Sequence, residues 1–245
     1  MEKSEKLILG LDEAGRGPVL GPMVLSLVCC NEYELKDLER LDIKDSKKLS
    51  KNKREKIYNE IMDNFTVKSI ILEAKDIDKY MIDKNINLNR IELMAFTKLI
   101  NNLLKEKYGI SIKNRKLPKN TSVKIYIDAC SNNESAFSNQ IISKLIANGN
   151  LSVIGEHKAD DKYKIVSAAS IVAKVLRDRI IENYKKIYGN IGSGYPSDKI
   201  TMNYLKNYVI KNGDLPDIAR KSWKTSRELL DNYGNLNKQR KLFEW

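Results

Sequence analysis

The sequence has few cysteines, almost no histidine and no long hydrophobic run. Of its 245 residues, three are cysteine and one is histidine. The cysteines, at positions 29, 30 and 130, form no Cys-x-x-Cys pair, which argues against a disulfide framework and against a thiolate zinc site. A single histidine also excludes a histidine-based metal cluster. This cysteine usage is typical of a reducing compartment, so we expect a cytoplasmic protein.

Membrane and disordered classes fit the composition poorly. No apolar run approaches the length of about 18 residues that a membrane-spanning helix needs. Residues 1–16 (MEKSEKLILGLDEAGR) are too acidic, and their apolar part is too short, for a signal peptide. Charged residues make up 31% of the chain and its mean hydropathy is −0.47, which excludes an integral membrane protein. A hydrophobic fraction of 42% is too high for a disordered chain.

The chain is short of acids relative to bases. It has 44 Lys and Arg against 32 Asp and Glu, for a net charge of +12. Such an excess favours a polyanionic partner, nucleic acid before an anionic membrane surface. A composition rich in Lys, Asn and Ile can also reflect the source organism alone. Charge therefore favours nucleic acid only modestly, and the decision depends on a site.

Hydrophobic patterning alternates between strands and helices along the chain. Strands are predicted at residues 6–12, 23–30, 67–73, 123–128 and 151–156. Helices are predicted at residues 51–65 with Ser50 as N-cap, and at 88–107, 134–147, 163–188, 201–212 and 223–232. The interleaving indicates an α/β fold of three layers, followed by a helical appendage of about 50 residues. The sequence shows neither an internal repeat nor a low-complexity linker.

Acidic residues end two of the predicted strands. Asp12 ends the first and Glu13 comes directly after it, and Asp128 ends the fourth. If these strands are parallel neighbours, their acidic ends share one small volume, where a hard divalent cation would relieve the repulsion. Successive residues of a strand point to opposite faces, so Asp12 and Glu13 can both bind only if the strand bends or one of them acts through backbone or water. Any one such acid is more often a mere strand end or helix cap.

Two further acids and a glycine-rich loop are also candidates for the site. Asp160 and Asp161 precede the long predicted helix, and spacing alone cannot choose between them. Residues 10–17 nearly match a phosphate-binding P-loop, but Arg16 and Gly17 replace its Lys and Ser/Thr, and prolines interrupt the helix that should follow. We therefore exclude nucleoside triphosphate binding. The loop's small residues still let the backbone approach a phosphate or a sugar hydroxyl closely.

Several separate blocks of sequence together resemble ribonuclease HII, most closely its single-chain archaeal form. The blocks are GLDEAGRGPVLGPM (residues 10–23), DSKKL (45–49), YIDA (126–129), EHKAD (156–160), SAASIVAK (167–174) and GSGYPSD (192–198). They run in order from residue 10 to about residue 225. The catalytic subunit of eukaryotic ribonuclease H2 is similar but has a longer C-terminal region. Ribonuclease HIII is a related alternative, disfavoured because the chain lacks a long N-terminal extension.

The resemblance implies a fold, a set of ligands and a reaction. It implies a ribonuclease H-like catalytic domain with a mixed sheet over residues 1–190, and a C-terminal helical region over residues 191–245. Asp12, Glu13, Asp128 and Asp160 are the implied catalytic residues, holding two divalent ions, Mg²⁺ or Mn²⁺. The implied reaction cuts the RNA strand of RNA–DNA hybrids, and the 5′ side of ribonucleotides embedded in duplex DNA. It leaves 3′-hydroxyl and 5′-phosphate ends and serves ribonucleotide and primer removal in replication and repair.

Substrate contacts are expected at nine residues. Gly15, Arg16 and Gly17 would read the 2′-hydroxyl that distinguishes RNA from DNA, and Tyr195 would pack on the ribose near an RNA–DNA junction. Lys47, Lys48, Arg177, Arg220 and Lys224 are interpreted as phosphate contacts, which give affinity without sequence information. Ordinary solvated surface is the alternative for each of these basic residues. A basic binding module without catalysis is the competing hypothesis, but such a module has no reason to gather four acids opposite phosphates.

The C-terminal residues suggest a protein partner. Gln239, Leu242 and Trp245 follow the spacing of tails that bind the sliding clamp, PCNA. An aromatic and an apolar residue on one helical turn can fill a hydrophobic groove. The second terminal aromatic residue of such tails is absent. This tail is the candidate partner-binding segment, and an exposed chain end without a binding function is the alternative.

Overall fold

The computed structural model describes residues 4–41, 43, 49–131 and 133–235. The chain divides into two compact units, here called the sheet unit and the helical unit. The sheet unit comprises Met1–Ala14, Val24–Ile70 and Asn89–Val175, and the helical unit comprises Gly15–Met23, Ile71–Leu88 and Leu176–Trp245. This division differs from the boundary predicted at residue 190. The reason is that two early segments share their contacts with the C-terminal part of the chain, which the order of residues does not show.

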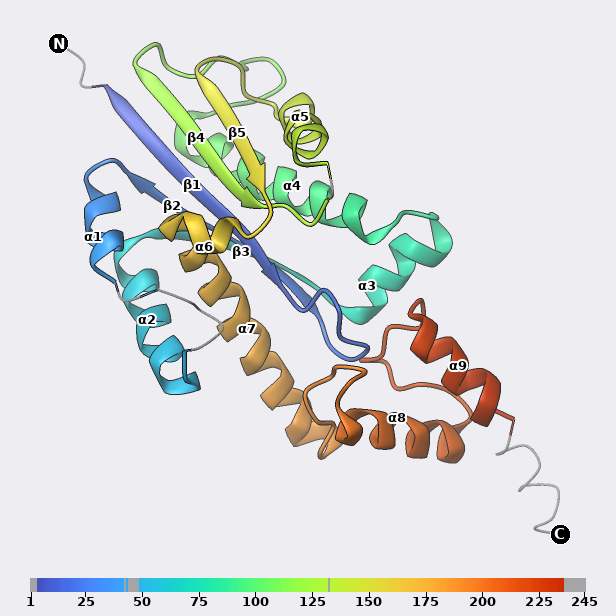
Figure 1. Cartoon of the computed structure of the whole chain (residues 1–245). Helices are drawn as coiled ribbons and strands as arrows, with labels where there is room; N and C mark the ends of the chain where they lie inside the picture. Colours follow the sequence, from blue (N-terminus) through green and yellow to red (C-terminus); the bar gives the residue numbers. More distant parts are fainter. Residues whose placement is uncertain (1–3, 42, 44–48, 132, 236–245) are drawn as a thin grey trace, which may run out of the picture. The chain divides into compact units, whose positions relative to one another are not determined.

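A mixed sheet of five strands forms the centre of the sheet unit (Figure 1). The strands are β1 (Glu5–Ala14), β2 (Met23–Asn31), β3 (Thr66–Leu72), β4 (Thr121–Asp128) and β5 (Leu151–Glu156). Their order is β3-β2-β1-β4-β5, in which β1 is antiparallel to β2 but parallel to β4, and β4 is parallel to β5. The sequence predicted all five strands to within two residues at each end.

Long helices also follow the prediction, whereas the short ones were missed. The helices are α1 (Glu34–Arg40), α2 (Lys51–Asn64), α3 (Ala74–Asp78), α4 (Leu88–Tyr108), α5 (Glu134–Lys144), α6 (Ala159–Lys162), α7 (Lys164–Tyr188), α8 (Lys199–Asn212) and α9 (Lys224–Tyr233), with a π-helical turn at Lys79–Asp83. Ser50 caps α2 as predicted, because its side chain accepts a hydrogen bond from the Lys53 amide at 3.3 Å. The helices α1, α3 and α6 span two turns or less, too little for a hydrophobic period to appear.

The two faces of the sheet pack against different helices. Gly10 of β1 faces the start of α7, where a Cβ added to Gly10 would lie 2.3 Å from the backbone of Ile165. Gly155 of β5 points to the opposite face, where a Cβ would lie 2.9 Å from the ring of Phe137 in α5. The sheet therefore lies between two helical layers, which confirms the predicted three-layer α/β fold.

A methyl group at Gly10 is expected to destabilise the protein strongly. The Gly10→Ala side chain would overlap the carbonyl carbon and oxygen of Ile165, both backbone atoms that cannot rotate away. We expect the free energy of unfolding to fall by about 3 kcal/mol, and hence the melting temperature by roughly 10 °C.

Thermal unfolding measures the effect of Gly10→Ala, and Gly17→Ala is the matched control. A Cβ at Gly17 would meet only a ring carbon of Tyr195, at 3.9 Å. Its melting temperature should stay within about 2 °C of the wild type. Equal melting temperatures for the two variants would show that β1 and α7 do not pack this closely.

The helical unit has a hydrophobic core of its own. Val19 and Leu20 pack there with apolar residues of α8 and α9, among them Leu205, Val209 and Leu229. Residues 15–23 thus belong to this core although they follow β1 directly in the sequence. Among the described residues, no helix combines the length and the apolar character needed to cross a bilayer.

Candidate metal centre and nucleic-acid interface

Three carboxylates from separate parts of the chain meet in the sheet unit. Asp12 lies near the end of β1, Asp128 ends the parallel neighbour β4, and Asp160 lies in α6. Each offers one oxygen atom, and these oxygens lie within 4.8 Å of one another. Asp12 and Asp160 are buried. The structure therefore brings Asp12 and Asp128 together as expected, and it adds Asp160 to them.

The electrostatics of this cluster favour a cation. The pKa of Asp12 is raised from 3.8 to about 7, mainly because burial disfavours its charge, and then because Asp128 lies close. The nearby Ser170 hydroxyl and the positive charge of Lys174, both on α7, oppose this shift. Mg²⁺ and Mn²⁺ prefer carboxylate oxygens as ligands and would relieve the remaining repulsion. The residues present thus fit a site for a divalent metal ion.

Glu13 lies on the other face of the sheet from Asp12. Its carboxylate clusters with Glu92 of α4 and with Cys130, whose ligand atoms lie within 4.8 Å of one another. The Cys130 thiol donates a hydrogen bond to Glu13 Oε1 at 3.2 Å. Burial raises the pKa of Glu13 well above its usual value, and Asp12 and Glu92 raise it further. The alternation of strand side chains therefore holds here, and Glu13 does not join the three aspartates directly.

In the helical unit, Arg220 supports the glycine loop from inside. Its guanidinium donates hydrogen bonds to the carbonyl oxygens of Gly15 at 2.6 Å, Arg16 at 2.9 Å and Gly21 at 3.0 Å. Arg220 is 0% exposed. This placement corrects the expectation of a phosphate contact, because a buried guanidinium held by three carbonyls cannot reach a nucleic-acid backbone. Arg220 shapes the loop instead.

Arg177 lies beside the same loop and beside Tyr195. It is 5% exposed, and its Nη2 donates to the Ser193 carbonyl at 3.3 Å. Its guanidinium carbon lies 5.3 Å from the ring centroid of Tyr195, and a Cβ at Gly15 would lie 2.5 Å from its Nε. The expectation that Arg177 contacts phosphate at the surface is thus also corrected. Arg177 is instead a buried support that brings Gly15 and Tyr195 together. Tyr195 itself is exposed.

Comparison with known proteins identifies the family. The family model described as Ribonuclease HII matches residues 9–226. The chain belongs to the ribonuclease HII family. It is therefore an enzyme, a metal-dependent endonuclease of the ribonuclease H type. Ribonuclease HII of Methanococcus aeolicus is 63% identical over 240 residues, which cover 97% of this chain and 86% of that protein.

Solved structures of archaeal members of the ribonuclease HII family share the fold. Ribonuclease H2 from Pyrococcus horikoshii OT3 superposes with a TM-score of 0.78 at 37% identity, covering 93% of this chain and 98% of that one. The ribonuclease HII in the PCNA:RNase HII complex from Archaeoglobus fulgidus gives 0.74 at 33% identity, covering 89% and 95%. The predicted ribonuclease H-like fold is confirmed by these neighbours.

Sequence reasoning missed Glu92 and Cys130 as neighbours of Glu13 in this ribonuclease HII. A signal for Glu92 was present, because it lies on the apolar stripe of α4 between Leu88 and Ala95, where a carboxylate is out of place. Cys130 follows Asp128 by two residues, but the direction in which its side chain points depends on how the chain turns after β4. Only the three-dimensional arrangement shows that both residues approach Glu13.

The other residues considered in the sequence are either exposed or lie outside the described part of the chain. Asp161 is exposed, unlike its neighbour Asp160. His157 is also exposed, and its backbone amide donates to Glu134 Oε1 at 2.7 Å. Lys47, Lys48 and the tail residues Gln239, Leu242 and Trp245 lie outside the described part of the chain.

Stability of the metal-free enzyme should depend on pH through Asp12. The folded-state pKa of Asp12, about 7, exceeds its ordinary value of 3.8. Between these values the folded state binds more protons than the unfolded state, so the contribution of Asp12 to stability falls as pH rises and is flat above pH 7.

We therefore compare the melting temperatures of the wild type and Asp12→Asn in the presence of chelator. As the pH rises from about 4 to about 7, the melting temperature of the wild type should fall relative to that of Asp12→Asn. Added Mg²⁺ or Mn²⁺ should reverse this difference at pH 8, because ions bind the charged carboxylates of the wild type more tightly. A difference that is constant across this range would contradict the raised pKa.

Proposed function

We propose that this enzyme hydrolyses the RNA strand of RNA–DNA hybrids, and that it cuts duplex DNA on the 5′ side of an embedded ribonucleotide. The products would be a 3′-hydroxyl and a 5′-phosphate. The observation that carries the proposal is the meeting of Asp12, Asp128 and Asp160 in one largely buried cluster. Membership of the ribonuclease HII family supports the substrate class. Removal of ribonucleotides and primers in replication and repair, in the cytoplasm, is the corresponding role.

The four carboxylates have separate parts in this proposal. Asp12, Asp128 and Asp160 would hold two divalent ions, Mg²⁺ or Mn²⁺. Glu13, which points away from this cluster, would act on the ions through the backbone or a water molecule. When bound, such ions lower the pKa of the attacking water and stabilise the leaving oxygen. Lys174 and Ser170 act on Asp12 to favour its ionised form, which is the form that binds metal. No protein side chain then needs to act as a general base.

The helical unit supplies the proposed contacts to the ribose. The Gly15-Arg16-Gly17 backbone would meet the 2′-hydroxyl, the group that distinguishes RNA from DNA. Arg220 holds this loop by the carbonyl oxygens of Gly15 and Arg16. Tyr195, exposed beside Arg177, would pack on the neighbouring sugar. Lys47 would contact phosphate.

We also propose that the C-terminal tail binds the sliding clamp. Support comes from the spacing of Gln239, Leu242 and Trp245, and from the related enzyme of Archaeoglobus fulgidus, whose structure is a complex with PCNA. Isothermal titration of the clamp with a peptide of residues 236–245 tests this. Binding that is lost in the Trp245→Ala peptide supports the tail, and an intact peptide that does not bind refutes it.

Cleavage of a defined duplex tests the enzymatic proposal. The substrate is a DNA duplex with one ribonucleotide, and the matched control is the same duplex made of DNA alone. We expect a single cut on the 5′ side of the ribonucleotide, no cut in the control, and no cut when the metal is removed by chelator. Equal cutting of both duplexes, or cutting in the presence of chelator, would refute the proposal.

A further inference from the structure

A hollow of about 420 Å³ lies next to the glycine loop in the helical unit. We call it the Trp223 hollow. It is lined by Arg16, Gly17, Met81, Leu88, Ser222, Trp223 and Lys224. Apolar side chains supply much of the wall, two of the lining residues are cationic and none is acidic. Its chemistry therefore suits a flat or apolar group attached to a negative charge.

The aromatic wall is held in place before any ligand arrives. The Trp223 indole N–H donates to the Gly17 carbonyl at 3.3 Å, and the guanidinium carbon of Arg220 lies 4.7 Å from the indole ring centroid. Trp223 is thus fixed against the loop that Arg220 also supports. Because the ring is already ordered, a ligand that contacts it loses little additional freedom.

The opposite wall is tied to the same segment. Asp78 accepts hydrogen bonds from the backbone amides of Lys221 at 2.7 Å and Ser222 at 2.9 Å, and from the Ser222 hydroxyl. The π-helical turn that follows Asp78 carries Met81, whose sulfur lies 3.7 Å from the same hydroxyl. These contacts join the two walls, so the Trp223 hollow is preformed.

Two cations, Arg16 and Lys224, line the hollow. Lys224 is 85% exposed in its side chain and makes only a loose surface pair with Glu228, at 3.6 Å. Such exposed pairs contribute little and are readily exchanged for a phosphate. Arg16 lies in the glycine loop itself and lines the hollow from that side. Positive charge thus accompanies the apolar wall.

We propose that the Trp223 hollow is a subsite for a nucleotide that flanks the ribonucleotide in the substrate. Trp223 contacts its base, and Arg16 and Lys224 contact its phosphate. The inference rests on the proposed function, because it places the flanking nucleotide beside the loop that reads the ribose. An aromatic contact of this kind requires no particular base, which suits an enzyme that must act wherever a ribonucleotide occurs.

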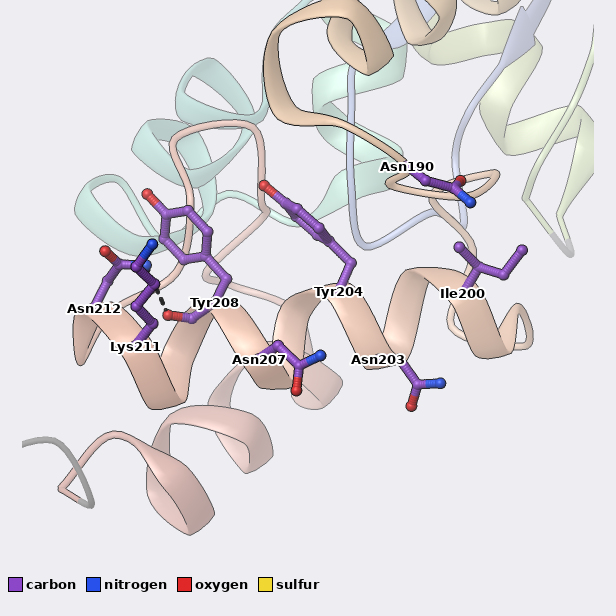
Figure 2. A pocket seen from close by; sticks show the side chains of 8 residues that line it. All are labelled: Asn190, Ile200, Asn203, Tyr204, Asn207, Tyr208, Lys211 and Asn212. Atoms are coloured by element: carbon purple, nitrogen blue, oxygen red, sulfur yellow. Dashed lines mark hydrogen bonds between the residues drawn. The ribbon is translucent and has the colours of Figure 1, made fainter.

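A second hollow of the helical unit differs in chemistry and supplies the control. Figure 2 shows it along α8, where it has a volume of about 570 Å³ and is lined by asparagine and tyrosine side chains with Lys211 at one end. It does not include the glycine loop. Lys211 is exposed like Lys224, so its removal changes the net charge equally at a position outside the proposed subsite.

Two variants of Trp223 isolate the aromatic contact. Both Trp223→Phe and Trp223→Leu lose the hydrogen bond to Gly17, so a shift of the loop that follows from this loss is common to them. Only Trp223→Leu loses the aromatic ring. In an Asp128→Asn background, which prevents cleavage, we expect Trp223→Leu to bind a duplex with one ribonucleotide roughly tenfold more weakly than Trp223→Phe. Equal affinities would overturn the proposal, provided that thermal unfolding shows both variants to be folded.

An abasic site in the duplex locates the contacted base. At one flanking position, loss of the base should weaken binding of the Trp223→Phe protein roughly tenfold and leave the Trp223→Leu protein unaffected. Equal losses for both proteins at every position would contradict a contact between the ring and a base.

Lysine variants test the phosphate contact. Lys224→Ala should weaken binding and reduce the slope of log affinity against log salt by about one, whereas Lys211→Ala should leave the slope unchanged. Identical slopes for the two variants would contradict the phosphate contact.

The wild-type enzyme separates this inference from the proposed function. If the enzyme cuts the ribonucleotide-containing duplex while the two Trp223 variants bind alike, only the subsite is wrong. If the wild type cuts no such duplex, the proposed function itself is wrong.

Discussion

Asp128→Asn is expected to reduce cleavage of a ribonucleotide-containing duplex by at least about a thousandfold, because metal ions supply several kcal/mol of transition-state stabilisation. Asp128 shares its cluster with Asp12 and Asp160, and all three offer oxygens within 4.8 Å of one another. An amide keeps the shape of the side chain but removes one of the negative charges that hold the cation. Duplex binding should change only a few-fold, because contacts to phosphates and sugars lie elsewhere.

Asp161→Asn is the matched control for Asp128→Asn. It removes the same charge from the residue next to Asp160, but Asp161 is exposed and lies outside the cluster. Single-turnover cleavage with excess enzyme measures both variants, and filter binding in chelator measures their affinity for duplex. Comparable cleavage by Asp128→Asn and the wild type would show that the cluster is not the catalytic centre.

Arg220→Lys should impair both stability and discrimination, although it keeps the charge. One ammonium group cannot replace the forked contacts of Arg220 with the carbonyls of Gly15, Arg16 and Gly21. Buried carbonyl oxygens would lose their donors, so we expect the free energy of unfolding to fall by about 3 kcal/mol. The loosened loop should lower kcat/KM for a single-ribonucleotide duplex more than it lowers affinity for an all-DNA duplex.

Arg227→Lys provides the comparison for Arg220→Lys, because Arg227 is exposed on the neighbouring helix α9. Its melting temperature and kcat/KM should match those of the wild type. If Arg220→Lys is as stable and as selective as Arg227→Lys, the loop does not depend on the buried guanidinium.

The sequence predicted the sheet and part of the site because both follow from local patterns. Apolar runs that end in acids gave β1 and β4, and their parallel pairing brings Asp12 and Asp128 to one edge. Strand alternation also anticipated that Asp12 and Glu13 would face different ways. The choice of Asp160 depended on resemblance to a family, since spacing alone did not separate it from Asp161.

The supports of the site could not be predicted in the same way. Arg220 lies about 200 residues from the loop that it binds, and a basic residue near a nucleic-acid motif is ordinarily expected on the surface. Its role depends on burial among carbonyl groups, which no local pattern encodes. The division into two units could not be predicted for the same reason. It depends on long-range contacts, which place residues 15–23 with the C-terminal helices.

Anomalous X-ray scattering from crystals grown with Mn²⁺ and an uncleaved ribonucleotide-containing duplex tests the central claim most directly. Scattering peaks should lie about 2.2 Å from carboxylate oxygens of Asp12, Asp128 and Asp160 and next to the phosphate on the 5′ side of the ribonucleotide. Crystals of the Asp128→Asn variant should show weaker peaks there or none. Manganese bound elsewhere in an active enzyme, with those aspartates unligated, would contradict the account.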